Sequence, residues 1–273
     1  MKKYMLIILI NLIHSSIFGQ NNNFLIEYKY YFTNDSLNVS EKLSETMVLR
    51  TYDKGFVFLP KNIFRDDTIP GDVSKYMKDG VIQINEVYKD GGKTYHRLKL
   101  FYNKSENKYL TQVNVSFTAV DFEDVVPTIS WKLMNEEKEI KGYKVKKAIT
   151  NLFGRSWEAW YTEDVPISYG PYKFNGLPGL ILDIKDSQNL FHFEFVGITK
   201  SNSSIPKPFK IGRVKMTRDE FIDYIKKYKE NPFIVLGNRN SVVKGDEEFL
   251  KRKKHRLEAN NNSIERGLQL NLK

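Results

Sequence analysis

Histidines and carboxylates are the side chains of this sequence that could carry acid–base or metal chemistry. His192 and Glu194 lie two residues apart in an alternating segment, so they share one face of an expected strand and could act as an acid/base pair. A hydrogen-bonded polar pair on the solvent face of a sheet is the commoner meaning of such spacing. His96, His192 and His255 do not have the spacing of a metal motif, and the chain has no cysteine. The sequence therefore predicts no metal site and no cofactor.

Short acidic clusters stand at Asp66-Asp67, at residues 121–124 and at Glu163-Asp164. A calcium site needs several oxygen ligands at fixed spacing and a turn-forming glycine, and none of these clusters has that set, so we expect each to be a solvated loop or strand edge. The sequence also lacks the motifs of serine hydrolases, zinc peptidases and nucleotide-binding loops. We therefore expect a non-catalytic protein. An enzyme with an acid/base pair is the alternative.

The positive charge of the chain is concentrated in its last quarter. The whole sequence carries a formal charge of +10, yet residues 20–206 hold as many acidic as basic side chains. A dense basic run includes the side chains of Lys251, Arg252, Lys253, Lys254 and Arg256. It lacks the interleaved aromatic residues of a nucleic-acid platform, so we expect no nucleic-acid partner. Contact with an anionic membrane surface and a simple solvated helix face are the two remaining interpretations.

The first nineteen residues have the pattern of a secretory signal peptide. Lys2 and Lys3 precede an apolar run over residues 4–13, and the small Gly19 suits cleavage before Gln20. The apolar run is too short to span a bilayer, which needs about twenty residues. We expect an exported chain without a transmembrane segment after cleavage, located in the periplasm or at the periplasmic face of the outer membrane.

The rest of the chain is dominated by period-two alternation. A hydrophobic fraction of 41% and an aromatic fraction of 14% predict a packed globule rather than a disordered chain. Expected strands cover residues 24–32, 45–52, 56–59, 81–88, 93–103, 109–117, 128–133, 141–150, 153–161, 180–184 and 191–195. Short turns join several of them, which favours antiparallel pairing. The fold class is therefore mainly β with late α, as a single curved antiparallel sheet or half-barrel with C-terminal helices.

Helical patterns occur only near the end of the chain. Thr217 and Glu220 have the spacing of a capping box, which predicts a helix over about residues 217–230. A weaker helix is expected over residues 246–259, and the following polar residues 260–263 suggest a frayed connection. We divide the chain into a signal peptide (1–19), an antiparallel β domain (20–240) and a basic helical C-terminal appendage (241–273).

An aromatic loop follows the strand expected over residues 153–161. The rigid pair Gly170-Pro171 lies inside it, and three aromatic side chains, Tyr169, Tyr172 and Phe174, have no regular element to pack into. Such side chains either form a lid over the core or line a ligand-binding lip. If they form a lip, Trp157 and Tyr161 on the preceding strand are further candidate contacts.

The loop ends in the hexapeptide Gly176, Leu177, Pro178, Gly179, Leu180 and Ile181. This segment resembles the signature of the GLPGLI family, which comprises exported proteins of Gram-negative bacteria with no established activity. The resemblance extends through residues 129–133, 140–148 and 154–160 to a closing segment at 261–265, where Ser263 stands in place of a proline. Many members have a cysteine where this chain has Val145, so a thiol-dependent role does not carry over. We expect the curved sheet and this loop to bind an apolar ligand or a partner protein, and the resemblance implies an outer-membrane protein as that partner.

Overall fold

The computed structural model describes residues 23–66, 77–78, 81–82, 95, 98–115, 118–208, 210, 212–231, 247–259 and 261–266. The expected signal peptide, His96 and most of the strand expected over residues 81–88 lie outside these residues. In the described part of the chain, no helix is both long and apolar enough to cross a membrane.

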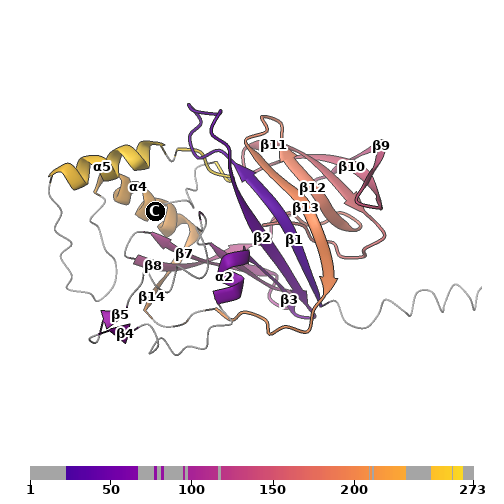
Figure 1. The fold of residues 1–273 in the computed structure, drawn as a ribbon, viewed down its shortest axis with the longest axis horizontal. Helices are drawn as coiled ribbons and strands as arrows, with labels where there is room; N and C mark the ends of the chain where they lie inside the picture. Colours follow the sequence, from indigo (N-terminus) through magenta and orange to yellow (C-terminus); the bar gives the residue numbers. More distant parts are fainter. Residues whose placement is uncertain are drawn as a thin grey trace, which may run out of the picture.

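Twelve strands form one open, strongly curved sheet (Figure 1). In chain order, its first six strands are β1 (Phe24–Phe32), β2 (Leu43–Tyr52), β3 (Gly55–Pro60), β6 (Lys99–Asn103), β7 (Lys108–Val115) and β8 (Thr118–Val125). The six strands that follow along the chain are β9 (Lys132–Ile140), β10 (Tyr143–Leu152), β11 (Arg155–Thr162), β12 (Leu180–Asp186), β13 (Phe191–Lys200) and β14 (Arg213–Thr217). The short pair β4 (Met77–Lys78) and β5 (Val81–Ile82) forms a separate two-stranded sheet.

The strands follow the order β14-β8-β7-β6-β3-β2-β1-β13-β12-β11-β10-β9. Neighbours pair antiparallel, as expected, except that β14 lies parallel to β8. β7 and β8 run across the direction of β1, β2 and β13, because the sheet twists and bends over its width (Figure 1). The expected mainly β fold with one curved sheet is therefore confirmed.

The concave face of the sheet holds the main core. On β1, Tyr28, Tyr30 and Phe32 alternate with half-buried polar residues and are at most 4% exposed. Phe191, Phe193 and Phe195 on the neighbouring β13 face the same way, and the rings of Tyr30 and Phe193 stack at 4.1 Å. Period-two alternation thus places the aromatic residues on one face, as the sequence predicts.

The convex face carries a smaller apolar cluster. Val57, Leu59 and Phe101 form its centre, and α2 (Lys61–Asp66) and Ile205 cover it. The segment around Ile205 connects β13 to β14, and we call residues 201–208 the strap. Arg50 on β2 holds the strap by donating hydrogen bonds to the carbonyl oxygens of Ser201 (2.7 Å) and Ser203 (2.9 Å).

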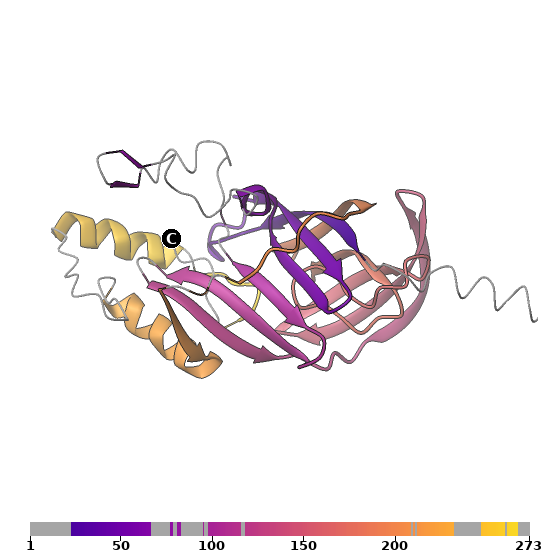
Figure 2. The same ribbon diagram turned by 90° about the horizontal axis from the view of Figure 1, so that it is seen from below.

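Two late helices lie at the end of the molecule opposite β9 and β10 (Figures 1 and 2). α4 (Arg218–Glu230) begins with the expected capping box of Thr217 and Glu220, and it packs Phe221 on Phe122 at a ring distance of 4.5 Å. α5 (Glu247–Ala259) follows the weaker expectation over residues 246–259, and Leu257 on it is buried.

Several strands differ from the expectations, and β14 has no expected counterpart. β8 runs through the acidic cluster at residues 121–124, which the sequence analysis did not interpret as a strand. β9 begins at Lys132 and ends at Ile140, whereas the expected strand covered residues 128–133. The reason is that β9 is an edge strand without a single buried residue, so no hydrophobic alternation marks it.

Candidate functional site

The aromatic loop between β11 and β12 turns back into the concave face of the sheet. Ile181 N donates to Tyr169 O at 3.2 Å, and Leu180 N donates to Val165 O at 3.1 Å, so both ends of the loop are joined. Gly176 has a φ of +89°, a conformation that favours glycine. A Cβ at Gly179 would lie 1.9 Å from Thr162 O, so only glycine allows this approach of the two backbones. The two glycines of the hexapeptide are therefore required by the shape of the loop.

The aromatic residues that the sequence singled out lie in the core. Trp157 and Tyr161 on β11 are each 2% exposed, and Phe174 in the loop is fully buried. The Trp157 and Phe174 rings meet edge to face at 4.7 Å, and Trp157 Nε1 donates to Leu152 O at 2.9 Å. Tyr172 is buried as well, whereas Tyr169 is half-buried between Phe56 and Tyr102.

The other members of the proposed binding lip divide between the core and the surface. Six of these residues are buried: Gly170, Pro171, Leu177, Gly179, Leu180 and Ile181. Gly176 and Pro178 are exposed. The loop fills the concave face with its own side chains, so a ligand could contact Trp157 or Phe174 only if the loop left the sheet.

A buried ionic network lies at the base of the loop. Lys173 is 2% exposed, and its Nζ lies 2.6 Å from Asp124 Oδ2 on β8 and 2.8 Å from Glu265 Oε1. Arg218 at the start of α4 reaches the same two carboxylates, with Nη1 at 3.2 Å from Asp124 Oδ1 and Nη2 at 2.5 Å from Glu265 Oε2. The Tyr172 hydroxyl donates to Glu265 Oε1. Two cations and two carboxylates thus compensate each other inside the protein.

The charges of this network control its protonation. Burial alone raises the pKa of Glu265, but Lys173 and Arg218 outweigh that effect and hold the pKa below its usual value. Burial alone lowers the pKa of Arg218, and the two carboxylates outweigh it and raise the pKa. Burial raises the pKa of Tyr172, so its hydroxyl keeps its proton. The network is therefore a set of fixed ion pairs, which locks the loop, β8, α4 and the closing segment at 261–265 together.

A second buried arginine fixes the same closing segment. Arg155 Nη1 lies 3.1 Å from Asp186 Oδ2, and Nη2 donates to Asn262 Oδ1 at 2.6 Å and to Ser263 O at 2.8 Å. Asn262, Ser263 and Glu265 are each at most 7% exposed. The expectation of a frayed connection over residues 260–263 is therefore wrong for Asn262 and Ser263, because side chains far away in the sequence satisfy their polar groups.

Sequence reasoning missed the members of the network. Lys173 was passed over, although a lysine between Tyr172 and Phe174, two residues expected to be buried, indicates a buried charge that needs partners. Asp124 was assigned to a solvated cluster, and Glu265 was noted only as part of the closing segment. No local pattern links them, because Lys173 is 49 and 92 residues away from its two partners.

The histidine pair expected from the sequence is not formed. His192 Nε2 lies 2.8 Å from Asp183 Oδ2 on the neighbouring β12, and both side chains are partly exposed on the convex face. Glu194 instead hydrogen-bonds with Tyr31 on β1 and, after burial, contributes to raising the pKa of that tyrosine. Among the described residues, no group of three or more histidine, cysteine or acidic side chains is placed to hold a metal ion.

The basic run of the C-terminal appendage lies on α5. Lys251, Arg252 and Lys254 are exposed, and Arg252 pairs with Glu248 one turn earlier at 2.5 Å. The side chains of Lys253 and Arg256 lie outside the described part of the structure.

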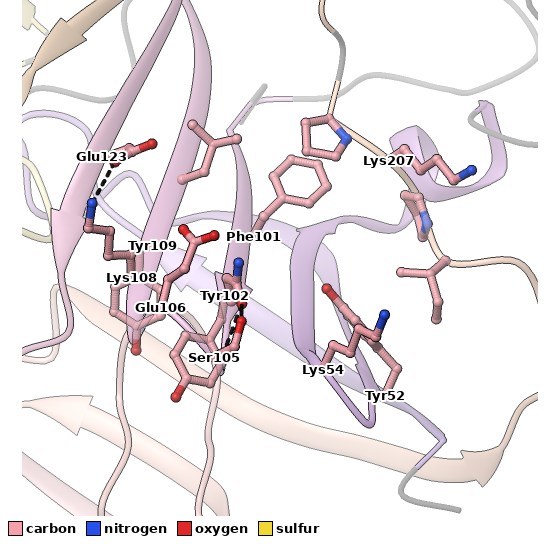
Figure 3. Close-up of a pocket in the computed structure, with 15 residues that line it drawn as sticks. Tyr52, Lys54, Phe101, Tyr102, Ser105, Glu106, Lys108, Tyr109, Glu123 and Lys207 are labelled. Carbon is pink, nitrogen blue, oxygen red and sulfur yellow. Dashed lines mark hydrogen bonds and ion pairs between the residues drawn. The ribbon is translucent and has the colours of Figure 1, made fainter.

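A groove of about 600 Å³ opens between the strap and the β6–β7 hairpin, and we call it the strap groove (Figure 3). Phe101, Tyr102 and Tyr52 line it, and Lys54 and Lys207 stand on the side of the strap. On the opposite side, Lys108 Nζ lies 3.2 Å from Glu123 Oε2. This groove combines aromatic surface with charges of both signs.

Comparison with known proteins supports the fold more than a function. Residues 153–183, which contain β11, the aromatic loop and the start of β12, match the model of a family described as "Protein of unknown function (Porph_ging)". No curated protein matches the chain. The solved structures that match include PNGF-II in space groups P21 and C2.

Both PNGF-II structures have a TM-score of 0.52 and a sequence identity of 18% to this chain. They cover 82% and 84% of this chain, which in turn spans only 38% of the PNGF-II chain. At this identity the likeness concerns the fold alone.

Proposed function

We propose that the chain is an exported, non-catalytic protein of the GLPGLI family that binds an extended segment of a partner protein in the strap groove. The observation that carries this proposal is the aromatic and charged lining of that groove, next to a concave face that the aromatic loop fills. The buried side chains of Tyr172, Phe174 and Leu177 in the aromatic loop fill the concave face, where the sequence suggested an apolar ligand, so we favour the strap groove.

The size and lining of the strap groove favour a peptide. Its volume of about 600 Å³ lies within the range of about 300–1,000 Å³ that is typical of ligand sites. The half-buried Tyr52 offers a face for an apolar anchor residue, and Phe101, which is 7% exposed, lines the groove beside it. Tyr and Phe are enriched at protein interfaces. Lys54, Lys207 and Glu106 stand around them, and such mixed charges suit a polypeptide better than a lipid tail.

The walls of the strap groove are held in place before any partner binds. Arg50 fixes the strap through the carbonyl oxygens of Ser201 and Ser203. Lys104 N donates to Lys54 O at 2.8 Å and so joins the β6–β7 turn to the β2–β3 turn. Little conformational entropy is therefore lost from the protein on binding, which favours affinity.

Selection from a random peptide library tests this proposal. We expect selected peptides with an aromatic or aliphatic anchor, whose dissociation constants are measured by isothermal titration calorimetry. Replacing Tyr52 by alanine removes a half-buried aromatic wall, and we expect affinity to fall about tenfold or more, as for a binding hot spot.

Tyr31→Ala is the matched control, because Tyr31 is a partly exposed tyrosine on the convex face of β1, away from the groove. Its peptide affinity should equal that of the wild type. If no peptide is enriched, or if Tyr52→Ala binds the selected peptides as tightly as Tyr31→Ala does, the strap groove is not the binding site.

The export that we propose rests on the first nineteen residues. Cell fractionation of the full chain should place a shortened protein, starting at Gln20, in the periplasm or with the outer membrane. Replacing Lys2 and Lys3 by glutamate should slow this export, because the charged start of a signal peptide is lost. A chain that stays in the cytoplasm at full length would contradict the proposal.

A second candidate function is attachment to an anionic membrane surface through α5. The exposure of Lys251, Arg252 and Lys254 favours it. Sedimentation with phosphatidylglycerol vesicles should then decrease as salt rises past physiological strength, where the screening length is about 8 Å. Binding that is insensitive to salt, or that persists when these three residues are changed to glutamine, would rule this function out.

A further inference from the structure

A second groove, of about 690 Å³, lies between α4, the β12–β13 turn and the closing segment of the chain. We call it the basic groove, because Arg155, Lys226, Lys229 and Arg266 line it and no acidic residue does. Ile222 and Ile225 on α4 form an apolar wall beside these cations. None of the residues that carry the proposed function lines this groove.

Among the residues that the structure describes, ion pairs compensate two of the four cations. Asp186, which does not line the groove, pairs with Arg155. Asp223 pairs with Lys226 at 3.0 Å on the exposed side of α4. Among the described residues, Lys229 and Arg266 have no ion-pair partner. Arg266 has one polar contact, in which Nη2 donates to Gln188 Oε1 at 3.3 Å. Asp35 lies near the groove, but it accepts from Asn261 Nδ2 and does not line the groove.

The two arginines of the basic groove act on each other. Burial lowers the pKa of Arg155, Asp186 opposes this, and the charge of Arg266 lowers it further. Two like charges on the wall of one cavity repel each other, and an anion between them would relieve that repulsion. Arg155 is 7% exposed and held by Asp186, Asn262 and Ser263, so its guanidinium has a fixed position.

We propose that the basic groove binds a phosphate or carboxylate group that carries a small apolar substituent. Arg266 and Lys229 supply the charges that the anion neutralises, and guanidinium groups bind such oxyanions with good geometry. The apolar substituent lies against Ile222 and Ile225. Gln188 lines the same cavity, and its side-chain amide nitrogen offers a hydrogen-bond donor.

Calorimetric titration of the full chain with inorganic phosphate, phenyl phosphate and benzoate tests the proposal. We expect phenyl phosphate to bind more tightly than inorganic phosphate, because only the former uses the apolar wall. Arg266→Gln and Lys229→Gln should each weaken its binding about tenfold, as expected for loss of a charge-assisted contact, and affinity should fall with added salt.

Lys227→Gln is the matched control, since Lys227 is an exposed lysine of α4 that does not line the groove. Vesicles of phosphatidylglycerol form a second arm that separates a lipid headgroup from a free anion. If Arg266→Gln weakens vesicle binding and Lys227→Gln does not, the anion belongs to a lipid. If the two variants differ in this way for phenyl phosphate but not for vesicles, the anion belongs to a soluble ligand. If neither probe binds, or if all three variants bind like the wild type, the proposal is wrong, while the peptide test of the strap groove is unaffected.

Discussion

Replacing Lys173 by methionine removes the cation at the centre of the buried network and keeps the volume of the side chain. Asp124 and Glu265 then share only Arg218, which is itself 35% exposed at its side chain. Breaking a buried ion pair by removing one partner costs about 3–5 kcal/mol, because a buried charge is left uncompensated. Domains are stable by about 5–15 kcal/mol in total, so this one substitution should remove a large part of the stability.

Equilibrium unfolding in urea, followed by tryptophan fluorescence and circular dichroism, measures this loss. Lys146→Met is the matched control, because Lys146 pairs with Glu163 at 3.0 Å on the exposed surface, with side chains 45% and 50% exposed. We expect no measurable change for this control, since surface pairs are screened by solvent.

The double variant Lys173→Met with Glu265→Gln separates charge compensation from packing. It leaves one cation and one carboxylate, Arg218 and Asp124, so the network is balanced again. Its loss of stability should be smaller than the sum of the two single losses by about 0.5–3 kcal/mol. Additive losses, or a Lys173→Met variant as stable as Lys146→Met, would refute the view that this network holds the loop and the closing segment together.

Three further outcomes follow from other contacts. The pKa of Glu265 is lower in the folded than in the unfolded chain, so the unfolded chain binds the proton more tightly. The stability that ionised Glu265 contributes should therefore be complete above about pH 4.5 and should be lost as the pH falls further. Urea unfolding over a pH series measures this loss. Gly179→Ala should strongly lower the melting temperature of the protein, because the new Cβ would meet Thr162 O. Gly197→Ala is the control and should melt like the wild type, since nothing lies within 4 Å of a Cβ at that position. Thr217→Ala removes a helix cap and should cost about 1 kcal/mol in the same unfolding assay, and no change would mean that tertiary packing alone holds α4.

Local patterns were sufficient for the elements that bury one face. The strand over residues 24–32 agrees with β1 at both ends, because every second residue is a large apolar side chain. The capping box at Thr217 likewise predicted the start of α4, because that contact spans only three residues. β9 could not be placed, since an edge strand with exposed residues on both faces has no such alternation.

The acidic cluster at residues 121–124 shows where local patterns are insufficient. Its charges suggested a solvated loop or strand edge, yet Phe122 faces the core and Asp121 and Asp124 are at most 9% exposed on opposite faces of β8. Arg213, 92 residues further along, holds Asp121, and Lys173 holds Asp124. Burial of these carboxylates was therefore decided by partners that only the folded chain brings near.

By itself, the sequence determined the class of the fold, because that class depends on the period of the apolar side chains. The aromatic loop remained either a lid or a ligand lip at that level. Only the tertiary structure decided that Trp157, Tyr172 and Phe174 fill the core. It also placed Lys173 and Glu265 together, since compensation of buried charge depends on distances in space and not on separation along the chain.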